Sequence, residues 1–206
     1  MNSLKLDPVK TISGEVVLPG SKSLTNRALL LAALAHGKTR IANILLSDDT
    51  RHMLTALAQL GTDARVDETN REVLVFGQGG PFPAKNEKRE FFLGNAGTAI
   101  RPLTAALSLT PGEYVIDGDT QMRERPIGDL VDALRTCGAD IAYLGDEGMP
   151  PLSCRSTGLA GGKLQMNGNI SSQYLTSMLL ALPLAEGDSE IEVVGEQVSK
   201  PYLAIT

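Results

Sequence analysis

The stretch Gly20-Ser21-Lys22-Ser23 is the first of three polar turns that recur at a fixed interval along the chain. Gly94-Asn95-Ala96-Gly97-Thr98 begins 74 residues later, and Gly168-Asn169-Ile170-Ser171-Ser172 begins another 74 residues on. Each turn leads into an Ala/Leu-rich stretch that predicts a helix. Unpaired N–H groups and the positive dipole end at a helix start favour anions. Three such starts therefore predict a site for a small, multiply anionic ligand.

The repeat extends beyond the turns. Arg27 and Arg101 follow their glycines at the same offset, and a second helix with two strand-like runs follows each of the first two turns. Each unit therefore fits the pattern βαβαββ, which predicts an α/β fold with about two and a half to three units in one domain. The predicted helices are 28–35, 50–60, 102–109, 127–137 and 173–184. The predicted strands are 14–18, 39–44, 64–66, 73–76, 114–116, 141–143, 152–155, 163–166 and 190–194.

The third unit is shorter than the second. Its second helix is expected near Ser199-Lys200-Pro201-Tyr202, and the sequence ends at Thr206, about one turn later. An isolated helical turn is marginal in water. The pattern favours the front part of a longer protein, truncated in its third unit.

Composition narrows the classes of function. A net charge of −5 argues against a general nucleic-acid or membrane surface. Cys137 and Cys154 fit no metal spacing, so two reduced thiols are expected, with no metal site. No stretch reaches the ~20 apolar residues that span a bilayer. Because residues 1–5 also lack a leader pattern, we expect a soluble cytoplasmic protein that binds neither nucleic acid nor membrane.

Side chains at the helix starts are the candidate binding groups. Lys22 and Arg27 are cations at a helix start, where they oppose the dipole, and this favours a ligand over a solvated surface pair. In the second turn, the glycines around Ala96 let backbone N–H groups approach a ligand, although a tight turn without a ligand explains them equally well. His36 and His52 are isolated from metal or triad partners, and we interpret both as structural.

Two further clusters have both a functional and an ordinary interpretation. Arg123-Glu124-Arg125-Pro126 is ordinarily an exposed charge run, but the repeat aligns it with Lys200-Pro201. Ser171-Ser172-Gln173 offers hydroxyl and amide partners for phosphate or hydroxyl oxygens, and is about equally consistent with a simple N-cap pair.

Several motifs occur together in this chain. They are Leu18-Pro19-Gly20-Ser21-Lys22-Ser23 with Asn26-Arg27-Ala28, the run from Gly94 to Pro102, Arg123-Glu124-Arg125-Pro126-Ile127, Ser171-Ser172-Gln173, and Ser199-Lys200-Pro201-Tyr202. As a set they closely resemble the 5-enolpyruvylshikimate-3-phosphate synthase family, in particular its bacterial form. The resemblance covers the whole chain.

The resemblance implies a fold and a reaction. The family has two domains of three βαβαββ units each, the enolpyruvyl transferase fold. Its enzymes transfer the enolpyruvyl group of phosphoenolpyruvate to the 5-hydroxyl of shikimate 3-phosphate and release phosphate, on the shikimate pathway to aromatic amino acids. They use no metal or organic cofactor, and glyphosate competes for the phosphoenolpyruvate site.

The resemblance also implies site residues. Those matched to the shikimate 3-phosphate site are Lys22, Ser23, Arg27, Ser171, Ser172, Gln173, Ser199 and Tyr202. Those matched to the phosphoenolpyruvate site are Lys22, Asn95, Gly97, Thr98, Arg125 and Gln173. Lys22 is in addition a candidate proton donor.

The resemblance assigns the two parts of the chain differently. Residues 20–206 match the first, shikimate 3-phosphate-binding domain, and residues 1–19 match a segment that packs with the second domain. The family's base aspartate, a glutamate and further Lys and Arg contacts lie in that second domain, outside this sequence. We therefore expect weak or no turnover from this chain alone.

Three alternatives remain open from the sequence. One is a non-catalytic module that captures shikimate 3-phosphate, and another is a relic that folds without binding. The third is the sister enzyme that transfers enolpyruvate to a UDP-sugar. That enzyme has Lys-Asn where this chain has Lys22-Ser23, and its loop cysteine is poorly matched by Cys137 at a predicted helix end.

Overall fold

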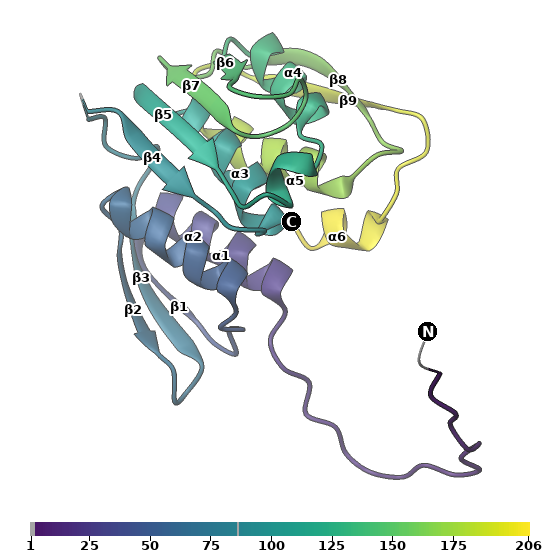
Figure 1. The fold of residues 1–206 in the computed structure, drawn as a ribbon. Coiled ribbons are helices and arrows are strands. Elements are labelled where there is room, and N and C mark those ends of the chain that lie inside the picture. Colours follow the sequence, from purple (N-terminus) through teal and green to yellow (C-terminus); the bar gives the residue numbers. More distant parts are fainter. Residues whose placement is uncertain (1–2, 86) are drawn as a thin grey trace.

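The part of the chain that the structure describes folds into three β-sheets with helices gathered between them (Figure 1). The computed structural model describes residues 3–85 and 87–206. The first unit contains α1 (Lys22–Leu34), β1 (His36–Ile41), α2 (Asp48–Gln59), β2 (Asp63–Asp67) and β3 (Glu72–Gln78). Its strands pair antiparallel in the order β1-β3-β2.

The second unit shows the complete predicted pattern. It consists of β4 (Arg89–Phe92), α3 (Gly97–Ser108), β5 (Gly112–Asp117), the 3₁₀ turn η1 (Met122–Glu124), α4 (Gly128–Thr136), β6 (Asp140–Tyr143) and β7 (Leu152–Ser156). The sheet order is β4-β5-β7-β6, with β4 parallel to β5 and the other pairs antiparallel. The mixed sheet follows from the chain path, because a helix joins the parallel pair whereas β6 and β7 are consecutive.

The third unit repeats the first part of this pattern. It consists of β8 (Gly162–Asn167), α5 (Ser172–Ala181), the 3₁₀ turn η2 (Leu182–Leu184), β9 (Ser189–Val194) and α6 (Lys200–Ala204). β8 lies parallel to β9, as β4 lies parallel to β5.

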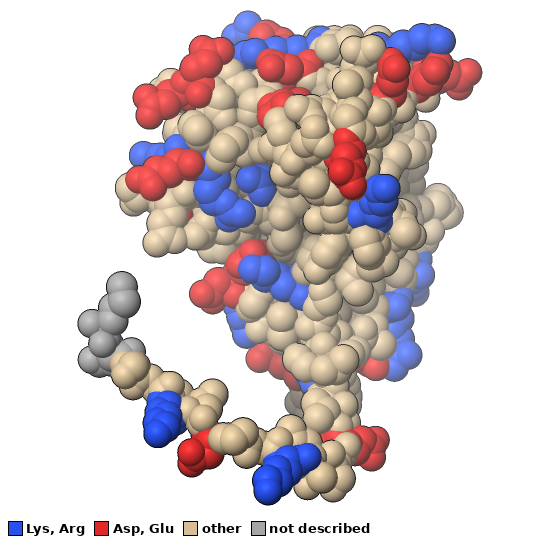
Figure 2. All heavy atoms as spheres, turned by 90° about the vertical axis from the view of Figure 1, so that its right-hand side faces the viewer, with Lys and Arg blue, Asp and Glu red and all other residues tan. Residues whose placement is uncertain are grey.

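The predicted strand 14–18 is wrong. Residues 3–19 form no strand or helix and stand away from the body in Figures 1 and 2. Val16 and Val17 are 79% and 78% exposed, so no partner strand covers them. Two smaller differences are that the sequence analysis gave no range for β4, a strand that the βαβαββ pattern requires, and that β1 begins three residues before the predicted start. Figure 2 also shows acidic and basic side chains interspersed over the face it presents.

The first helices of the three units pack side by side in the core. α3 contacts α1 on one side and α5 on the other. Apart from Thr98, every residue of α3 is buried, including Arg101. Leu and Ala supply most of this packing, as the scarcity of aromatic residues requires. The core therefore holds the starts of α1, α3 and α5 in one fixed arrangement.

Both cysteines are unpaired and buried, in agreement with the sequence prediction. Burial raises the pKa of the Cys154 thiol to about 11, so this group stays neutral at physiological pH.

Gly20 allows α1 to approach the loop after β1. A Cβ at this position would lie 2.0 Å from the carbonyl oxygen of Asn43 and 2.9 Å from the backbone nitrogen of Leu45. Both are backbone atoms of a packed turn, which cannot rotate away as a side-chain end can. We therefore expect Gly20→Ala to lower the free energy of unfolding by about 3 kcal/mol, measured by urea denaturation.

Gly145→Ala is the matched control for this substitution. The nearest atom to its new Cβ, a side-chain carbon of Pro151, lies at 3.5 Å, which is ordinary contact. The control should change stability by less than about 0.5 kcal/mol. Equal stability of the two variants would contradict the packing role of Gly20.

Candidate functional site

A cavity of about 290 Å³ lies where the starts of α1, α3, α5 and α6 meet. Its lining residues are Ser23, Arg27, Thr98, Ile170, Ser171, Ser172, Gln173, Val198, Ser199 and Tyr202. Every residue that the sequence matched to shikimate 3-phosphate is among them except Lys22. The lining is rich in hydroxyl groups and contains one cation, which suits an anionic, hydroxylated ligand at the small end of the usual pocket size.

Local sequence explains why these groups face the cavity. Ser21 caps α1 by accepting a hydrogen bond from the Leu24 N–H at 3.4 Å, and Ser171 caps α5 through the Gln173 N–H at 3.2 Å. α3 begins without a side-chain cap. Each cap fixes the first turn of its helix and so directs the residues that follow it.

Arg27 is the cation of the cavity. Arg27 is only 6% exposed, and its Nη2 donates to the Thr176 hydroxyl at 3.3 Å. Its Nη1 is buried without a hydrogen-bond partner, and no carboxylate within the described part of the chain forms an ion pair with it. The guanidinium lies 5.8 Å from the centroid of the Tyr202 ring. Desolvation by burial lowers the pKa of Arg27. The described part of the folded chain thus holds a buried cation without a counter-charge.

A second cluster forms beside the cavity at the start of α3. Arg125 donates through Nη1 to the backbone oxygen of Asn95 at 3.0 Å and to its side-chain oxygen at 2.9 Å. The Asn95 amide donates in turn to Gln121 at 2.6 Å. Gly97 lies against both arginines, because a Cβ there would be 2.5 Å from Arg125 Nη2 and 2.9 Å from Arg101 Nη1. The structure thus brings Asn95, Gly97 and Arg125 together, one residue away from Thr98 in the cavity wall.

Lys22 is separate from both groups. Its Nζ lies 3.0 Å from the Asp49 carboxylate at the start of α2, and its side chain is 45% exposed. It does not line the cavity, although the next residue, Ser23, does.

Arg123 fits the ordinary interpretation of an exposed charge run. The run Arg123-Glu124-Arg125 suggested two guanidinium groups beside one carboxylate. Instead, Arg123 pairs with Asp117 at 2.5 Å, and only Arg125 reaches the α3 start. Arg123 lies within the 3₁₀ turn η1 and Arg125 directly follows it, and the two arginines contact different partners.

Sequence reasoning missed three polar residues that join the helix starts. Asn26, which is fully buried, donates to the Thr98 hydroxyl at 2.9 Å. Arg101 donates to the Gln173 side-chain oxygen at 2.5 Å, and Thr176 accepts from Arg27. The matching offsets of Arg27 and Arg101 from their turns were the available indication of a shared role.

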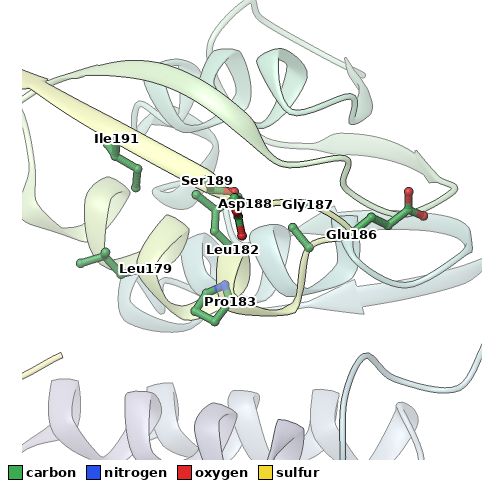
Figure 3. A pocket seen from close by; sticks show the side chains of 9 residues that line it. Leu179, Leu182, Pro183, Glu186, Gly187, Asp188, Ser189 and Ile191 are labelled. Atoms are coloured by element: carbon green, nitrogen blue, oxygen red, sulfur yellow. The ribbon is translucent and has the colours of Figure 1, made fainter.

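A larger hollow lies elsewhere, at the opposite end of α5. Figure 3 shows its wall of Leu179, Leu182, Pro183 and Ile191, with the carboxylates of Glu186 and Asp188 at its edge. Its volume is about 520 Å³. The wall contains no Lys or Arg, so it does not suit the anionic ligand that the helix starts favour.

Two further properties bear on the class of protein. Within residues 3–85 and 87–206, no three or more His, Cys, Asp or Glu side chains gather in a metal-binding arrangement. None of the helices described is long and apolar enough to cross a membrane.

Comparisons with known proteins agree on one family. The family model for EPSP synthase (3-phosphoshikimate 1-carboxyvinyltransferase) matches residues 6–206. The whole chain is 60% identical to the 3-phosphoshikimate 1-carboxyvinyltransferase of Sulfurovum sp. and 57% identical to that of Vibrio vulnificus, and it covers 48% of each. An EPSP synthase structure from Acinetobacter baumannii superimposes with a TM-score of 0.79 at 29% identity, covering 89% of this chain and 41% of that one.

The chain therefore belongs to the EPSP synthase family. The α/β fold of repeated units that the sequence predicted is confirmed. The chain spans about half the length of the curated relatives it matches.

Proposed function

We propose that this chain is the shikimate 3-phosphate-binding part of a cytoplasmic enolpyruvyl transferase. The reaction transfers the enolpyruvyl group of phosphoenolpyruvate to the 5-hydroxyl of shikimate 3-phosphate, giving 5-enolpyruvylshikimate 3-phosphate and phosphate. The observation that carries the proposal is the buried guanidinium of Arg27, which has no counter-charge among the described residues and lies in a cavity lined by hydroxyl groups. Family membership supplies the substrate class.

The cavity residues suit the phosphorylated acceptor. Ser171, Ser172 and Ser199 offer hydroxyl donors for the 3-phosphate, and Arg27 offers a charged fork. Tyr202 and Gln173 complete the wall. The cavity would bind a preformed dianion without first breaking an ion pair, because Arg27 has none in the described chain.

The second cluster suits the anionic donor substrate. Arg125 offers positive charge for a carboxylate or phosphate, and Asn95 holds its guanidinium in place. The Thr98 N–H, at the start of a helix without a side-chain cap, faces the same region. Glyphosate, an anionic competitor, would use the same groups. C2 of the enolpyruvyl group becomes cationic during transfer, and Lys22 is the proposed proton donor. Preorganised charge and the juxtaposition of two bound substrates are the expected sources of rate.

We further propose that a second domain completes the site. The family's base and additional cations belong to that domain, and residues 1–19 would pack against it. No metal or organic cofactor takes part in the proposed reaction.

Calorimetry with shikimate 3-phosphate tests the binding proposal directly. We expect saturable heat with this chain, and an absence of heat at millimolar ligand would contradict the proposal. A ligand-induced rise in melting temperature would in addition exclude a relic that binds nothing.

Phosphate release with both substrates then separates a catalytic chain from a binding module. We expect weak or no phosphate release from the 206 residues alone. Turnover near that of a two-domain enzyme would contradict our proposal that catalytic groups lie in a second domain.

Gly97→Ala should separate the two substrates. The added methyl would crowd Arg125 and Arg101, and the partly exposed Arg125 is the one free to move away. We expect the KM for phosphoenolpyruvate and the inhibition constant for glyphosate to rise about 10-fold or more in the full-length enzyme. The affinity for shikimate 3-phosphate, measured by calorimetry, should change less than about 3-fold. Equal losses would show that Gly97 is not on the phosphoenolpyruvate side.

A further inference from the structure

Arg101 occupies an unusual position for a guanidinium. It lies in the second turn of α3, at the core of the molecule, and its residue is 7% exposed. None of the carboxylates in the described chain forms an ion pair with it. Its guanidinium carbon lies 5.3 Å from the centroid of the Tyr174 ring. A buried cation without a carboxylate partner is costly, so its polar contacts indicate what it does.

Those contacts connect two parts of the candidate site. Arg101 Nη1 donates to the side-chain oxygen of Gln173 at 2.5 Å, and Nη2 donates to the backbone oxygen of Pro126 at 3.0 Å. The Tyr174 hydroxyl donates to the same Pro126 oxygen at 2.7 Å. Pro126 directly follows Arg125. Arg101 therefore lies between the cavity wall at Gln173 and the segment that carries Arg125.

The contact with Gln173 fixes the orientation of its amide. A glutamine side chain has one acceptor oxygen and one donor nitrogen, and the charged donor of Arg101 requires the oxygen. The amide nitrogen Nε2 is then left for the cavity that Gln173 lines, where it can only donate. An unconstrained glutamine would turn its oxygen to the cavity about as often as its nitrogen. An amide oxygen in that place would repel a phosphate or carboxylate.

We propose that Arg101 is a positioning residue: by engaging the Gln173 oxygen, it presents the Gln173 amide nitrogen to an oxygen of shikimate 3-phosphate. This inference rests on the proposed function, because it names shikimate 3-phosphate as the ligand. Arg101 itself does not line the cavity and acts through Gln173.

A double-mutant cycle tests the coupling of the two residues. The dissociation constant of shikimate 3-phosphate is measured by calorimetry for the unmodified chain, Arg101→Met, Gln173→Ala and the double variant. Each single change should weaken binding about 10-fold, and the double variant should be no weaker than about 10-fold, because Arg101 has no effect without Gln173. Losses that multiply to about 100-fold would overturn the proposal. Arg155→Met, which removes an exposed guanidinium paired with Glu113, should bind as the unmodified chain does.

Arg101→Lys and an NMR measurement guard against misfolding of the methionine variant. Lysine retains one charged donor for the Gln173 oxygen, so binding should recover to within about 3-fold of the unmodified chain. In the unmodified, ¹⁵N-labelled chain, the Gln173 side-chain amide resonance should shift on saturation with shikimate 3-phosphate. An unshifted resonance would overturn the positioning role. If the unmodified chain binds no shikimate 3-phosphate, the proposed function itself fails, whereas binding with multiplicative losses defeats only the role of Arg101.

Discussion

Lys22→Ala is expected to reduce enolpyruvyl transfer by the full-length enzyme about 1,000-fold, because general acid catalysis by the proposed proton donor contributes about 10²- to 10⁴-fold. The fold should survive, because Lys22 is half exposed and its pair with Asp49 at 3.0 Å is a partly solvated ion pair. Such pairs contribute about 0–1 kcal/mol to stability. Steady-state phosphate release and thermal unfolding, measured on the same preparations, check both parts of the expectation.

Two further variants separate the possible roles of Lys22. Lys22→Arg keeps the positive charge, but a guanidinium, whose pKa lies far above neutrality, does not give up its proton at neutral pH. If Lys22 is the proton donor, this variant should bind shikimate 3-phosphate and still fail to turn over. Lys163→Ala is the matched control. Lys163 Nζ forms an exposed ion pair with the Glu190 carboxylate at 2.7 Å, and neither residue lines the cavity. Wild-type turnover by Lys22→Ala would remove Lys22 from the mechanism.

Arg27→Met is expected to weaken the binding of shikimate 3-phosphate about 100-fold or more. Loss of one partner of a buried, hydrogen-bonded charge pair costs about 2–5 kcal/mol, and about 2.7 kcal/mol corresponds to that factor. The cavity would keep its hydroxyl groups, but its one cation would be gone. Calorimetry gives the change in affinity directly.

The same substitution should leave the unliganded protein as stable as before, or more stable. Arg27 is buried without a carboxylate partner in the described chain, and methionine fills a similar volume without charge. Folding lowers the pKa of Arg27, so burial of the protonated guanidinium decreases the free energy of unfolding. This destabilisation is present across the whole neutral range and is lost only as the pH rises to the ordinary arginine pKa. Thermal unfolding without ligand checks this expectation. Arg40→Met, at an exposed arginine paired with Glu72, should change neither property by much. A large loss of stability in Arg27→Met with unchanged affinity would make Arg27 structural.

The sequence predicted the helices well because their determinants are local. The polar turns at Gly20, Gly94 and Gly168 each precede a helix, in α1, α3 and α5. Side-chain caps and periodic apolar residues act within a few positions of each helix start, so a single sequence contains them. The 74-residue interval then gave the repeat, and with it the prediction that the three starts lie close together.

The strands were less predictable because a strand also depends on a distant partner. Residues 14–18 have the composition of a strand, and the structure leaves them unpaired and exposed. β4, from Arg89 to Phe92, was missed because two charged residues followed by two phenylalanines give no alternating pattern. Its order comes from its parallel pairing with β5, more than 20 residues away.

The site shows the same division between local and distant causes. The sequence could place Arg27 and Ser171 at helix starts, but it could not show that Lys22 pairs with Asp49 or that Arg123 pairs with Asp117. The bond between Arg101 and Gln173 joins residues 72 positions apart, and it exists because α3 and α5 pack together. The orientation of the Gln173 amide, with its oxygen toward Arg101, depends on that contact.

The enclosure of α3 limits how the pocket can adapt. This helix is packed between α1 and α5, and a shift of its backbone would open gaps on one side while forcing overlap on the other. Room for a bulkier ligand must therefore come from the rim of the pocket. Two less enclosed segments form this rim: Arg125, which directly follows the 3₁₀ turn η1, and α6, which has no buried residue. Substitutions that enlarge the pocket should accordingly arise more readily at these edges than at the inward-facing side chains of the central helix.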